Sequence, residues 1–480
     1  MRRKLMTSKK LLPEKTGDMS DWYTTLIQLA DLADYGPVKG TMIFKPYGYA
    51  IWEQVQKTLD KSIKEKGVEN VYFPMFIPMS FLEKEKSHVE GFAPELAVVT
   101  HGGGEKLQEP VVVRPTSETI MYSSFSKWVH SWRDLPILIN QWGSVVRWEK
   151  RTMPFIRTSE FLWQEGHTAH ATHEEAKAMQ EWAMKTYSDL YKEYFAMSGY
   201  VGYKSKAETF AGADTTLSYE TMMPSGKVLQ SCTSHDLGQN FAKAFDVKFQ
   251  DQNSIDTYVW QTSWGLSTRS IGGLILAHGD NNGLRLPPKL APVQIAIVPV
   301  RAEDKMLDYC KEISDVLTSI NVRVKTDARG DSSFGFRLNR WEVKGAPLIF
   351  KIGEKEVEAQ TITVKRRDTQ EEVTLDRKNL VDDVKKLLDE IQSTMLLQSK
   401  TFIEENTREA KNYDEFKKIL AEHKGYIKVY WNDNPDIEKK IKEETKAKSS
   451  CSPIDWPEGN GVDFFTGEPA TRQWLFAQSY

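Results

Sequence analysis

The sequence predicts a multidomain protein of mixed α/β and α+β class, and three observations lead to this expectation. A chain of 480 residues is too long for one hydrophobic core and suggests two to four domains. A proline cluster at 287–292 marks a domain boundary. Beyond it, apolar strand-like runs alternate with a helical pattern, which indicates a small α/β domain with a largely parallel sheet.

The region before that boundary mixes helical and strand patterns. Residues 1–20 are polar and basic, and we expect a flexible or docking arm there. Apolar residues four apart predict a helix at 51–66. The apolar segment 71–79 is broken by prolines, which favours an edge strand at an interface. The glycines at 102–104 predict a hairpin loop, because a phosphate-binding loop would need a following Gly-Lys-Ser/Thr and a helix.

The region after the boundary divides into two parts. The first has predicted strands at 294–300, 322–325, 348–352 and 361–364, with a helix at 302–319. A long amphipathic helix at about 380–400 leads into a charged third region, 403–480, with Lys-rich helices and an aromatic end. We therefore divide the chain into segments 1–20, 21–290, 291–395 and 396–480.

Composition and charge narrow the class of protein. The hydrophobic content of 40% is ordinary for a soluble globular protein, and the net charge of −3 gives no global basic field for nucleic acid. The three cysteines, Cys232, Cys310 and Cys451, are too few for a disulfide scaffold or a four-cysteine zinc site. The basic first residues lack a following apolar region, and no run of about 18 apolar residues occurs. We expect a cytoplasmic protein without a membrane span.

The stretch 145–167 carries the most specific chemistry. Arg147 and Glu149 belong to an apolar segment that predicts a strand at 145–149, and Arg157 and Thr158 lie in the basic loop that follows. A second strand-like run then begins near residue 160. A guanidinium group matches phosphate oxygens bidentately, and a carboxylate accepts from an exocyclic amine. The hairpin is therefore predicted to hold ATP.

These residues resemble motif 2 of the class II aminoacyl-tRNA synthetases. The segment 265–269 resembles motif 3, and the helix at 51–66 with the Pro74 strand resembles motif 1, which forms the dimer in that class. Together with Arg-Pro-Thr-Ser-Glu-Thr at 114–119 and the segment 233–240, they are similar to the prolyl-tRNA synthetases of the archaeal and eukaryotic-like type. The resemblance runs from about Trp22 to Tyr480.

The resemblance implies a fold for each segment. It places a class II catalytic domain with an antiparallel sheet at 21–290, a small α/β anticodon-binding domain at 291–395 and an α+β domain at 396–480. In the family, cysteines of this last domain hold zinc. Here the matching stretches 430–437 and 462–467 contain no cysteine, and Cys451 alone cannot make such a site. We expect the domain to be present without structural zinc.

The resemblance also implies the reaction, which is the ATP-dependent attachment of L-proline to tRNA(Pro) through prolyl-adenylate. The substrate carboxylate attacks the α-phosphate, so the protein supplies positioning and charge. Arg147 would bridge that carboxylate and the α-phosphate. Arg269 would hold the γ-phosphate at the start of a helix at 270–274, and Mg²⁺ would neutralise phosphate charge. The implied ATP contacts are Arg147, Glu149, Arg157, Thr158, Gln230, Thr233, Ser267 and Arg269.

The implied proline pocket must hold a secondary ammonium and a small apolar ring. Thr116 and Glu118 match the family's contacts to the ammonium. Aromatic walls around the ring would give shape selectivity. Taken alone, Trp163 and Phe210 fit ordinary core positions equally well. The implied proline contacts are Thr116, Glu118, Arg147, Trp163, Glu165, His167, Phe210 and His235.

Three histidines admit a second interpretation. His167, His170 and His173 recur at a spacing of three and, with Glu165, could form a metal site. We favour His167 in the pocket, with His170 and His173 at the start of a helix at 174–194.

The implied partners are tRNA and a second copy of the chain. The α/β domain carries candidate RNA-contacting cations, namely Arg329, Arg337, Arg340, Lys344, Arg366 and Arg367. Taken one at a time, each is more typical of a solvated surface charge. The stretch 174–258 is too short for the editing insertion of bacterial-type enzymes, which implies a separate protein for clearing mischarged alanyl-tRNA.

Two alternative functions can be weighed against this interpretation. A threonyl or seryl enzyme of the same subclass is one, but threonyl enzymes use a catalytic-domain zinc for which no Cys/His set is evident. A catalytically inactive, synthetase-like regulatory or tRNA-binding protein is the other. Such proteins usually lose a motif arginine or the anticodon domain, and this chain has both arginines, Arg147 and Arg269, and the domain.

Overall fold

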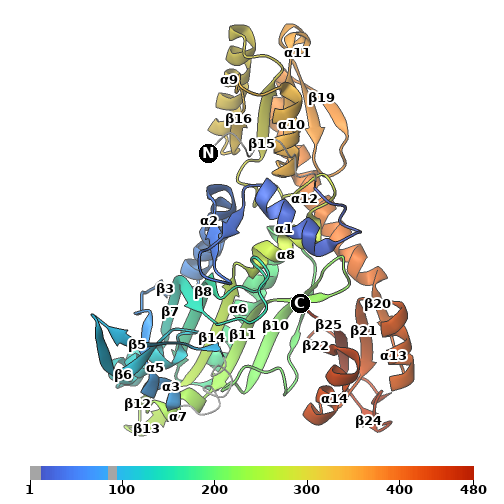
Figure 1. Ribbon diagram of the computed structural model, residues 1–480. Coiled ribbons are helices and arrows are strands. Elements are labelled where there is room, and N and C mark those ends of the chain that lie inside the picture. Colours follow the sequence, from blue (N-terminus) through green and yellow to red (C-terminus); the bar gives the residue numbers. More distant parts are fainter. Residues whose placement is uncertain (1–11, 85–94) are drawn as a thin grey trace.

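The computed structural model describes residues 12–84 and 95–480. These residues form three bodies (Figure 1). The largest contains the N-terminal half of the chain, the second lies above it, and the third lies to its lower right. Helix α12 (Leu380–Glu405) runs from the upper body down to the third one (Figure 1).

A large, mostly antiparallel sheet is the frame of the molecule. Within the described residues it has eleven strands, in the order β20-β21-β25-β22-β9-β10-β11-β14-β8-β7-β3. Only the outermost pairs, β3 with β7 and β20 with β21, are parallel. Its strands in the largest body are β3 (Glu69–Asn70), β7 (Ile137–Val146), β8 (Glu160–His170), β9 (Tyr200–Tyr203), β10 (Thr215–Met222), β11 (Val228–Gly238) and β14 (Trp260–Ser267).

The same sheet continues into the C-terminal body. Strand β22 (Ala447–Pro453) pairs antiparallel with β9, with Ser452 opposite Tyr203. Gly202 makes this contact possible, because a Cβ there would lie 2.6 Å from the carbonyl oxygen of Ser452. The C-terminal body is therefore joined edge to edge to the sheet of the largest body. Its other sheet strands are β20 (Thr407–Glu409), β21 (Tyr426–Tyr430) and β25 (Gln473–Gln478).

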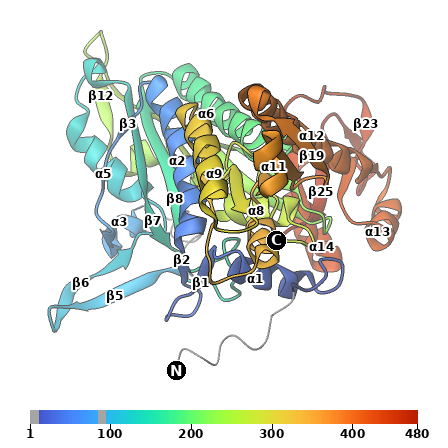
Figure 2. The ribbon, with the colours of Figure 1, turned by 90° about the horizontal axis from the view of Figure 1, so that it is seen from above.

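Helices cover one face of the sheet. Helix α6 (His173–Glu193) begins with a capping box between Thr172 and Glu175 and packs on β10, β11 and β14. Helix α2 (Pro46–Glu65) lies beside α6 (Figure 2) and confirms the helix expected at 51–66, with its start earlier, at Pro46. Two further helices are α5 (Glu118–Trp128) and α8 (Arg269–His278), which starts one residue before the predicted segment.

A hairpin projects from the largest body (Figure 2). Strands β5 (Ala97–Gly102) and β6 (Glu105–Val113) confirm the hairpin expected around the glycines. The strand expected at 71–79 is only partly right, because β4 spans Phe76–Pro78. Pro74 has no N–H for a ladder hydrogen bond, which accounts for the late start. Smaller elements here are β1 (Ala33–Tyr35), β2 (Met42–Phe44), α3 (Met79–Glu83), α7 (Asn240–Ala244), β12 (Lys248–Gln250) and β13 (Asp256–Tyr258).

The upper body has a mixed sheet, ordered β16-β15-β17-β18-β19 among the described residues. The expected strands and helix are present, but the expectation of a largely parallel sheet is wrong, because β17, β18 and β19 pair antiparallel. The short turn between Arg366 and Glu372 permits only antiparallel pairing of β18 with β19, because parallel pairing needs a long crossover. The elements are β15 (Ile295–Pro299), α9 (Asp304–Ser319), β16 (Val324–Thr326), α10 (Phe334–Val343), β17 (Leu348–Ile352), α11 (Glu354–Ala359), β18 (Thr361–Arg366) and β19 (Glu372–Asp376).

Two buried cations attach the upper body to the largest one. The Arg367 guanidinium forms two hydrogen bonds, of 2.5 and 2.8 Å, to the Asp280 carboxylate. Lys344 pairs with Asp31 at 3.0 Å. Arg337 is also buried and donates to the Asp327 carbonyl oxygen at 2.7 Å. These three side chains are packed inside the protein, so the expectation that they contact RNA is wrong.

The N-terminal segment docks on the largest body where it is described. Helix α1 (Met19–Leu29) begins inside the expected arm. The Lys15 ammonium donates to the carbonyl oxygens of Leu276 and Gly279, at 2.8 and 2.6 Å. Residues 12–20 are therefore tied to the end of α8, and the part of the arm at 1–11 lies outside the described residues.

The C-terminal body has an aromatic core that includes Trp431, Trp474 and Phe476. The two stretches without cysteine are joined by Asp463, whose carboxylate accepts from the backbone N–H groups of Asn432 and Phe465 at 2.8 and 2.9 Å. Among the described residues, no group of three or more His, Cys, Asp or Glu side chains is placed to hold a metal ion. The remaining elements are α13 (Tyr413–Glu422), α14 (Pro435–Thr445), β23 (Gly461–Val462) and β24 (Pro469–Ala470).

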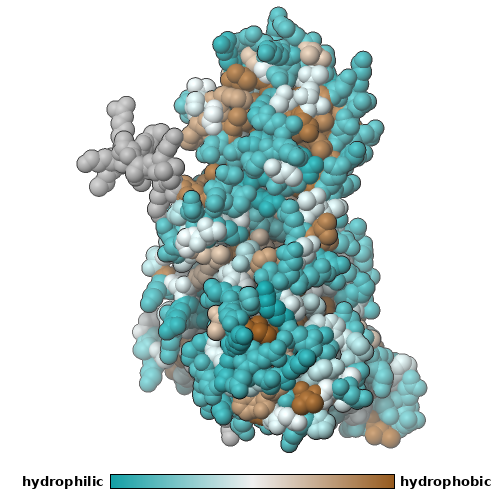
Figure 3. Space-filling view, turned by 90° about the vertical axis from the view of Figure 1, so that its right-hand side faces the viewer, coloured by the Kyte–Doolittle hydropathy of each residue, from teal (hydrophilic) through white to brown (hydrophobic). Residues whose placement is uncertain are grey.

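The surface is mainly polar on the face shown in Figure 3, where hydrophobic residues form small separate patches. Such scattered apolar side chains are ordinary for a protein surface. No helix within residues 12–84 and 95–480 combines the length and apolar character needed to cross a membrane.

Candidate active site

One cavity of the largest body gathers most of the predicted site residues. It holds about 920 Å³ of empty space, counted out to its open mouth. Strands β8, β11 and β14 supply most of its floor. All eight predicted proline contacts line it, as do five of the predicted ATP contacts: Thr116, Glu118, Arg147, Trp163, Glu165, His167, Phe210, His235, Gln230, Thr233, Ser267 and Arg269.

The other three predicted ATP contacts line an adjoining cavity. Glu149, Arg157 and Thr158 lie there, and this cavity shares Arg147 and Arg269 with the first one. The strand expected at 145–149 is wrong in its extent, because β7 ends at Val146. Its partner β8 begins opposite that residue, at Glu160. Arg147 and Glu149 therefore lie on the loop side of the hairpin, although the Arg147 N–H still donates to the Ser159 carbonyl oxygen at 2.9 Å.

The end of the cavity that is predicted to hold the amino acid is called here the amino-acid end, and its polar residues are Thr116, Glu118, Glu165, His167 and His235. The Glu165 carboxylate accepts from Gln141 Nε2 at 2.9 Å and lies 3.0 Å from His167 Nε2. The Thr116 hydroxyl donates to Glu118, and the Ser117 hydroxyl donates to Glu165. All of these groups are buried, so their hydrogen bonds fix the orientation of both carboxylates.

Two histidines of this end differ in charge preference. Burial by itself disfavours the charged imidazole of His167, but the hydrogen bond that its ring N–H donates to Glu165 and the charge of Glu118 outweigh this effect and raise its pKa. Burial lowers the pKa of His235 to about 4. His235 is therefore neutral at neutral pH, and its Nδ1 lies 2.9 Å from the Thr216 hydroxyl.

Gly166 allows the floor of this end to close. It lies between Glu165 and His167 on β8, and its strand neighbour on β14 is Trp264. A Cβ at Gly166 would lie 2.1 Å from the Trp264 ring. Any larger residue would displace the indole and the adjacent carboxylate.

The end that is predicted to hold ATP is called here the nucleotide end. It contains Arg147 and Arg269, which line both cavities, and Arg157 and Glu149 of the adjoining cavity. Arg147 Nε donates to the Pro115 carbonyl oxygen and Arg269 Nε to the Ile156 carbonyl oxygen, each at 3.0 Å. The pKa of Arg269 is lowered by burial and then by the positive charges of Arg147 and Arg157. Three mutually repelling cations facing connected cavities favour a polyanionic ligand.

The last residue of the sequence reaches this nucleotide end. Arg157 donates through a guanidinium nitrogen to the Tyr480 carbonyl oxygen at 3.2 Å. Glu149 lies 3.8 Å from the same guanidinium, and burial raises the Glu149 pKa. The Tyr480 hydroxyl bonds Ser225 at 2.8 Å, which anchors the contact. Sequence reasoning missed this contact, because it joins positions more than 300 residues apart.

The three spaced histidines have three separate partners. His167 contacts Glu165, His170 Nε2 lies 2.8 Å from the Thr168 hydroxyl, and His173 Nε2 lies 2.7 Å from Asp236. His173 begins α6 as expected, but His170 is the last residue of β8, so its expected place in the helix is wrong.

Several cavity residues were missed by sequence reasoning. Glu208 and Trp264 line the first cavity and Glu95 the adjoining one. The Trp163 Nε1 and Ser263 Oγ atoms are buried and have no hydrogen-bond partner among the residues that the structure describes, which suits groups that face a ligand. Glu208 could have been noticed because it lies two residues before Phe210, whereas Ser263 and Trp264 carry no signal beyond their place before motif 3.

An antiparallel sheet with a carboxylate-lined pocket beside an arginine-lined one defines a class II aminoacyl-tRNA synthetase, an enzyme that activates an amino acid with ATP. Matches to known domain families agree with this class. The tRNA synthetase class II core domain (G, H, P, S and T) matches residues 103–278, an anticodon binding domain matches 294–387, and the C-terminal domain of prolyl-tRNA synthetase matches 413–480.

Similar proteins identify the amino acid. The chain is 47% identical to a proline--tRNA ligase of Cytophaga hutchinsonii over 98% of this chain and 100% of that one. It is 46% identical to the chloroplastic/mitochondrial proline--tRNA ligase of Arabidopsis thaliana over 99% and 89%. The crystal structure of Cryptosporidium parvum prolyl-tRNA synthetase, complexed with halofuginone and AMPPNP, matches with a TM-score of 0.94 and 41% identity, over 98% and 99%.

The chain belongs to the prolyl-tRNA synthetase family. It is a ligase that attaches proline to tRNA at the expense of ATP, as the resemblance of its motifs implied. The threonyl and seryl alternatives are thereby excluded, since the relatives named above are proline--tRNA ligases over nearly the full chain.

Proposed function

We propose that the cavity binds L-proline at its amino-acid end and ATP, as its Mg²⁺ complex, at its nucleotide end. The observation that carries this assignment is the division of charge across two adjoining cavities that share Arg147 and Arg269. Buried carboxylates at one end suit the ammonium of the amino acid, and three arginines at the other suit a triphosphate. The reacting carboxylate and α-phosphate would meet between them, at Arg147.

At the amino-acid end, Glu118 supplies the charge that faces the proline ammonium, and Thr116 holds that carboxylate. Glu165 and His167 form the polar wall, and His235 stays neutral beside the ring. Trp163 and Phe210 provide the aromatic surface for the pyrrolidine. A pocket of this size discriminates by shape, at about 1–3 kcal/mol for a missing methylene group.

At the nucleotide end, the arginines divide the triphosphate among them. Arg147 contacts the α-phosphate and the substrate carboxylate, and Arg269 contacts the γ-phosphate from the start of α8. Glu149 accepts from the adenine amino group, with Arg157 and Thr158 beside the base. Gln230, Thr233 and Ser267 supply ribose and phosphate contacts. Magnesium enters with ATP, because it usually binds through phosphates and one or two carboxylates.

The reaction then follows in two steps. A proline carboxylate oxygen attacks the α-phosphorus and pyrophosphate leaves, giving prolyl-adenylate. A ribose hydroxyl at the tRNA 3′ end then attacks the prolyl carbonyl, and AMP leaves. Arginine stabilises the charge that develops on the phosphoryl oxygens, so no side-chain nucleophile is needed.

The domain assignment supports this reaction. We assign residues 21–290 to catalysis, 291–395 to the anticodon and 396–480 to the C-terminal domain, with 1–20 as a docking arm. Arg329, Arg340 and Arg366 remain candidates for RNA contact, although each also pairs with a carboxylate, namely Asp327, Asp31 and Asp368 in that order. We assign the protein to the cytoplasm; the three buried thiols, none in a disulfide, suit a reducing compartment.

Residues around the motif 1-like strand suit a homodimer. Tyr72 is 73% exposed, Phe76 53% and Trp128 48%, which is unusual for large apolar side chains near one sheet edge. A second copy of the chain would cover them. Sedimentation at working concentration checks this, and a monomer there would refute it.

Editing of mischarged tRNA requires a separate protein. The chain between the two ATP-binding motifs is occupied by α6, β9, β10, β11, α7 and the β12–β13 hairpin, all of which belong to the catalytic body. Deacylation of alanyl-tRNA(Pro) by the purified chain alone would contradict this proposal.

Pyrophosphate exchange into ATP, measured with each amino acid in the absence of tRNA, tests the site assignment. We expect exchange with proline and its loss in Arg147→Ala. Exchange that survives this substitution would remove the proposed role of Arg147, whereas absence of exchange with any amino acid would indicate a catalytically inactive relative.

A further inference from the structure

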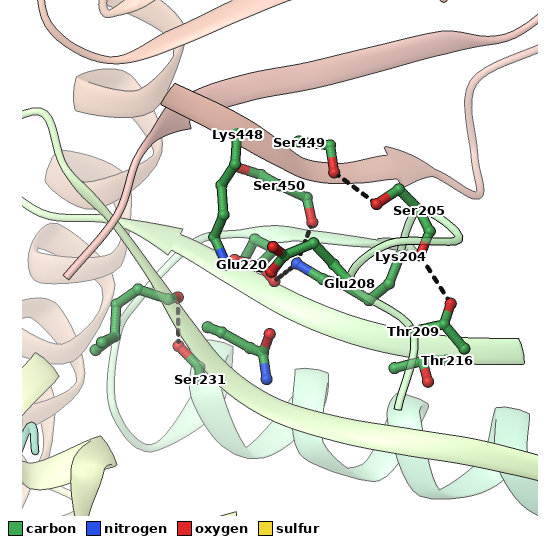
Figure 4. Close-up of polar contacts among 12 residues, drawn as sticks. Lys204, Ser205, Glu208, Thr209, Thr216, Glu220, Ser231, Lys448, Ser449 and Ser450 are labelled. Carbon is green, nitrogen blue, oxygen red and sulfur yellow. Dashed lines mark hydrogen bonds and ion pairs between the residues drawn. The ribbon is translucent and has the colours of Figure 1, made fainter. Parts of the chain in front are cut away.

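The segment 204–210 connects β9 to β10 and links two bodies of the molecule. We call it the pocket segment. Its last residue, Phe210, and its carboxylate Glu208 both line the cavity. Its first residues contact the C-terminal body, as Figure 4 shows.

Polar contacts to the C-terminal body begin at Lys204. Its ammonium is buried, donates to the Ser450 carbonyl oxygen at 2.6 Å and lies 3.3 Å from the Glu220 carboxylate. The backbone N–H of Lys206 donates to the Asp433 carboxylate at 3.1 Å. A buried ammonium with charged and carbonyl partners holds its backbone in one place, since losing a partner would leave an unpaired buried charge.

A second group of contacts centres on Glu438 of α14. Its carboxylate accepts from the Ser205 hydroxyl at 2.7 Å and from the backbone N–H of Ser449 at 2.9 Å. The Ser449 hydroxyl lies 3.0 Å from that of Ser205. Glu438 itself is only 2% exposed. The first half of the pocket segment is therefore fastened to the C-terminal body at Lys204, Ser205 and Lys206.

Glu208 links the C-terminal body to the cavity, because it contacts lysines of that body and also lines the cavity. Its carboxylate pairs with Lys448 and lies 3.6 Å from the Lys442 ammonium, and both lysines belong to the C-terminal body. Burial opposes the charged form of Glu208, but Lys448 outweighs it and the pKa is lowered. Glu208 is therefore an anion whose nearest cation, Lys448, comes from the C-terminal body, while Lys204 of the pocket segment itself also stabilises its charge.

A short series of contacts joins the pocket segment to His235 in the proposed proline site. The Thr209 hydroxyl donates to the Ser205 carbonyl oxygen at 2.8 Å, and the Phe210 N–H donates to the Thr216 hydroxyl at 3.1 Å. That hydroxyl lies 2.9 Å from His235, whose ring is 4.5 Å from the Phe210 ring. Phe210 and His235 together form one wall of the amino-acid end.

We propose that the C-terminal body positions the proline site, through the ion pair of Lys448 with Glu208 and the fastened pocket segment. Lys448 and Lys442 are positioning residues for Phe210 and His235. Without Lys448, Glu208 loses its nearest cation and lies beside the acidic amino-acid end, so the segment shifts and the wall loosens. This inference rests on the proposed binding of proline in this cavity.

Pyrophosphate exchange by full-length Lys448→Met tests the proposal. We expect the KM for proline to rise by roughly three- to tenfold, a range typical of residues that act on a site through their neighbours. The KM for ATP and kcat should change by less than about twofold, because the arginines keep their own contacts. Lys448→Arg should restore the proline KM, since guanidinium also pairs with Glu208.

Two further variants separate positioning from folding. Lys442→Met removes the more distant cation, so the proline KM should rise less, and this variant reports even if Lys448→Met gives little protein. Lys417→Met is the matched control, because Lys417 pairs with Asp414 at 3.1 Å inside the same body and far along the chain from the pocket segment. It should leave the proline KM unchanged.

The outcomes distinguish this inference from the proposed function. His235→Ala should raise the proline KM if proline binds in this cavity. If it does so while Lys448→Met and Lys442→Met both leave the proline KM unchanged, the positioning role of the two lysines is overturned. If His235→Ala also leaves the proline KM unchanged, the placement of proline in this cavity fails as well. A rise in the KM for ATP equal to that for proline would show general loosening and would likewise refute the proposal.

Discussion

The two ends of the active-site cavity are prepared for their ligands in different ways. At the amino-acid end, Glu165 is held by Gln141, Ser117 and His167, all within the protein. At the nucleotide end, Arg147 and Arg269 donate to backbone carbonyl oxygens, and their positive charges repel each other. The amino-acid end is therefore held by hydrogen bonds between side chains, whereas the nucleotide end carries an excess of positive charge.

This difference suggests that the amino-acid end provides selectivity and the nucleotide end provides transition-state stabilisation. Hydrogen bonds that hold Glu165 without ligand fix the shape of the proline pocket and support selectivity, because little reorganisation of this carboxylate is left to occur on binding. A cluster of cations gains most when phosphate arrives, and it stabilises charge that develops in the transition state. Substitutions at the nucleotide end should therefore affect kcat most, and those at the amino-acid end should affect KM.

The largest effect is expected for Arg147→Ala. Arg147 lies where the two ends meet, so its loss removes stabilisation of the reacting groups themselves. We expect kcat for pyrophosphate exchange to fall by about 10³-fold, in the range found when a single charge-stabilising donor is removed. A rise in KM with an unchanged kcat would contradict the proposed difference between the two ends. Lys417→Met again serves as the unaffected control.

Glu118→Gln should have the next largest effect, and it should act mainly on proline. The carboxylate is buried and accepts from Thr116, so the substitution keeps the shape but removes the charge facing the ammonium. Loss of one partner of a buried charge pair costs about 2–5 kcal/mol, so the proline KM should rise by about a hundredfold. Steady-state exchange at saturating ATP measures it. An equal rise in the KM for ATP would mean that the two ends are not separate.

The buried His235 at the amino-acid end predicts that the folded protein loses stability in acid. The pKa of His235 is lowered by burial to about 4, whereas the unfolded chain binds this proton near pH 6.5. The stabilising contribution is therefore complete above about pH 6.5 and is lost as the pH falls toward 4. At pH 5 the loss should be roughly 2 kcal/mol.

Urea unfolding of the protein and of His235→Gln, at pH 7.5 and pH 5, checks this expectation. The variant should lose less stability between the two pH values, because glutamine does not titrate. His170 and His278, whose pKa values burial also lowers to about 4, are present in both proteins and cancel. Equal losses in both proteins would show that His235 is not held neutral.

The difference between the two ends also explains what the sequence could predict. Arg147 and Glu149 belong to a short contiguous stretch whose residue types indicated a site for ATP. The residues of the proline wall were implied only by the resemblance to the family, because Trp163 and Phe210 taken alone fit ordinary core positions equally well. The predicted helix at 51–66 and the hairpin at 97–113 likewise follow from local spacing. Local patterns were sufficient wherever function depends on neighbours in sequence.

Features formed by distant segments could not be predicted in this way. The pairing of β22 with β9 joins Ser452 to Tyr203 through backbone hydrogen bonds, which leave no side-chain signature. The burial of Arg367 against Asp280 also depends on how two bodies pack. For the same reason, charged residues of the upper body looked like RNA contacts until their partners were known.

The smallest effect concerns the contact that the C-terminal body makes with the nucleotide end. The Tyr480 carbonyl oxygen accepts from Arg157, which also lies 3.8 Å from Glu149. Deleting Tyr480 frees that guanidinium to move toward Glu149, where it competes with adenine for the carboxylate. We expect the KM for ATP to rise about threefold, as for the loss of one modest hydrogen bond, while the KM for proline stays constant.

This result would complement that of Lys448→Met, which should raise the proline KM and leave that for ATP unchanged. Tyr480→Phe is the control for the deletion, because it keeps the carbonyl oxygen and removes only the hydroxyl that bonds Ser225. If the deletion raises the proline KM instead, the C-terminal body acts on the cavity as a whole. If each change moves only its own KM, the body contacts the two ends independently, through Tyr480 at one and Lys448 at the other.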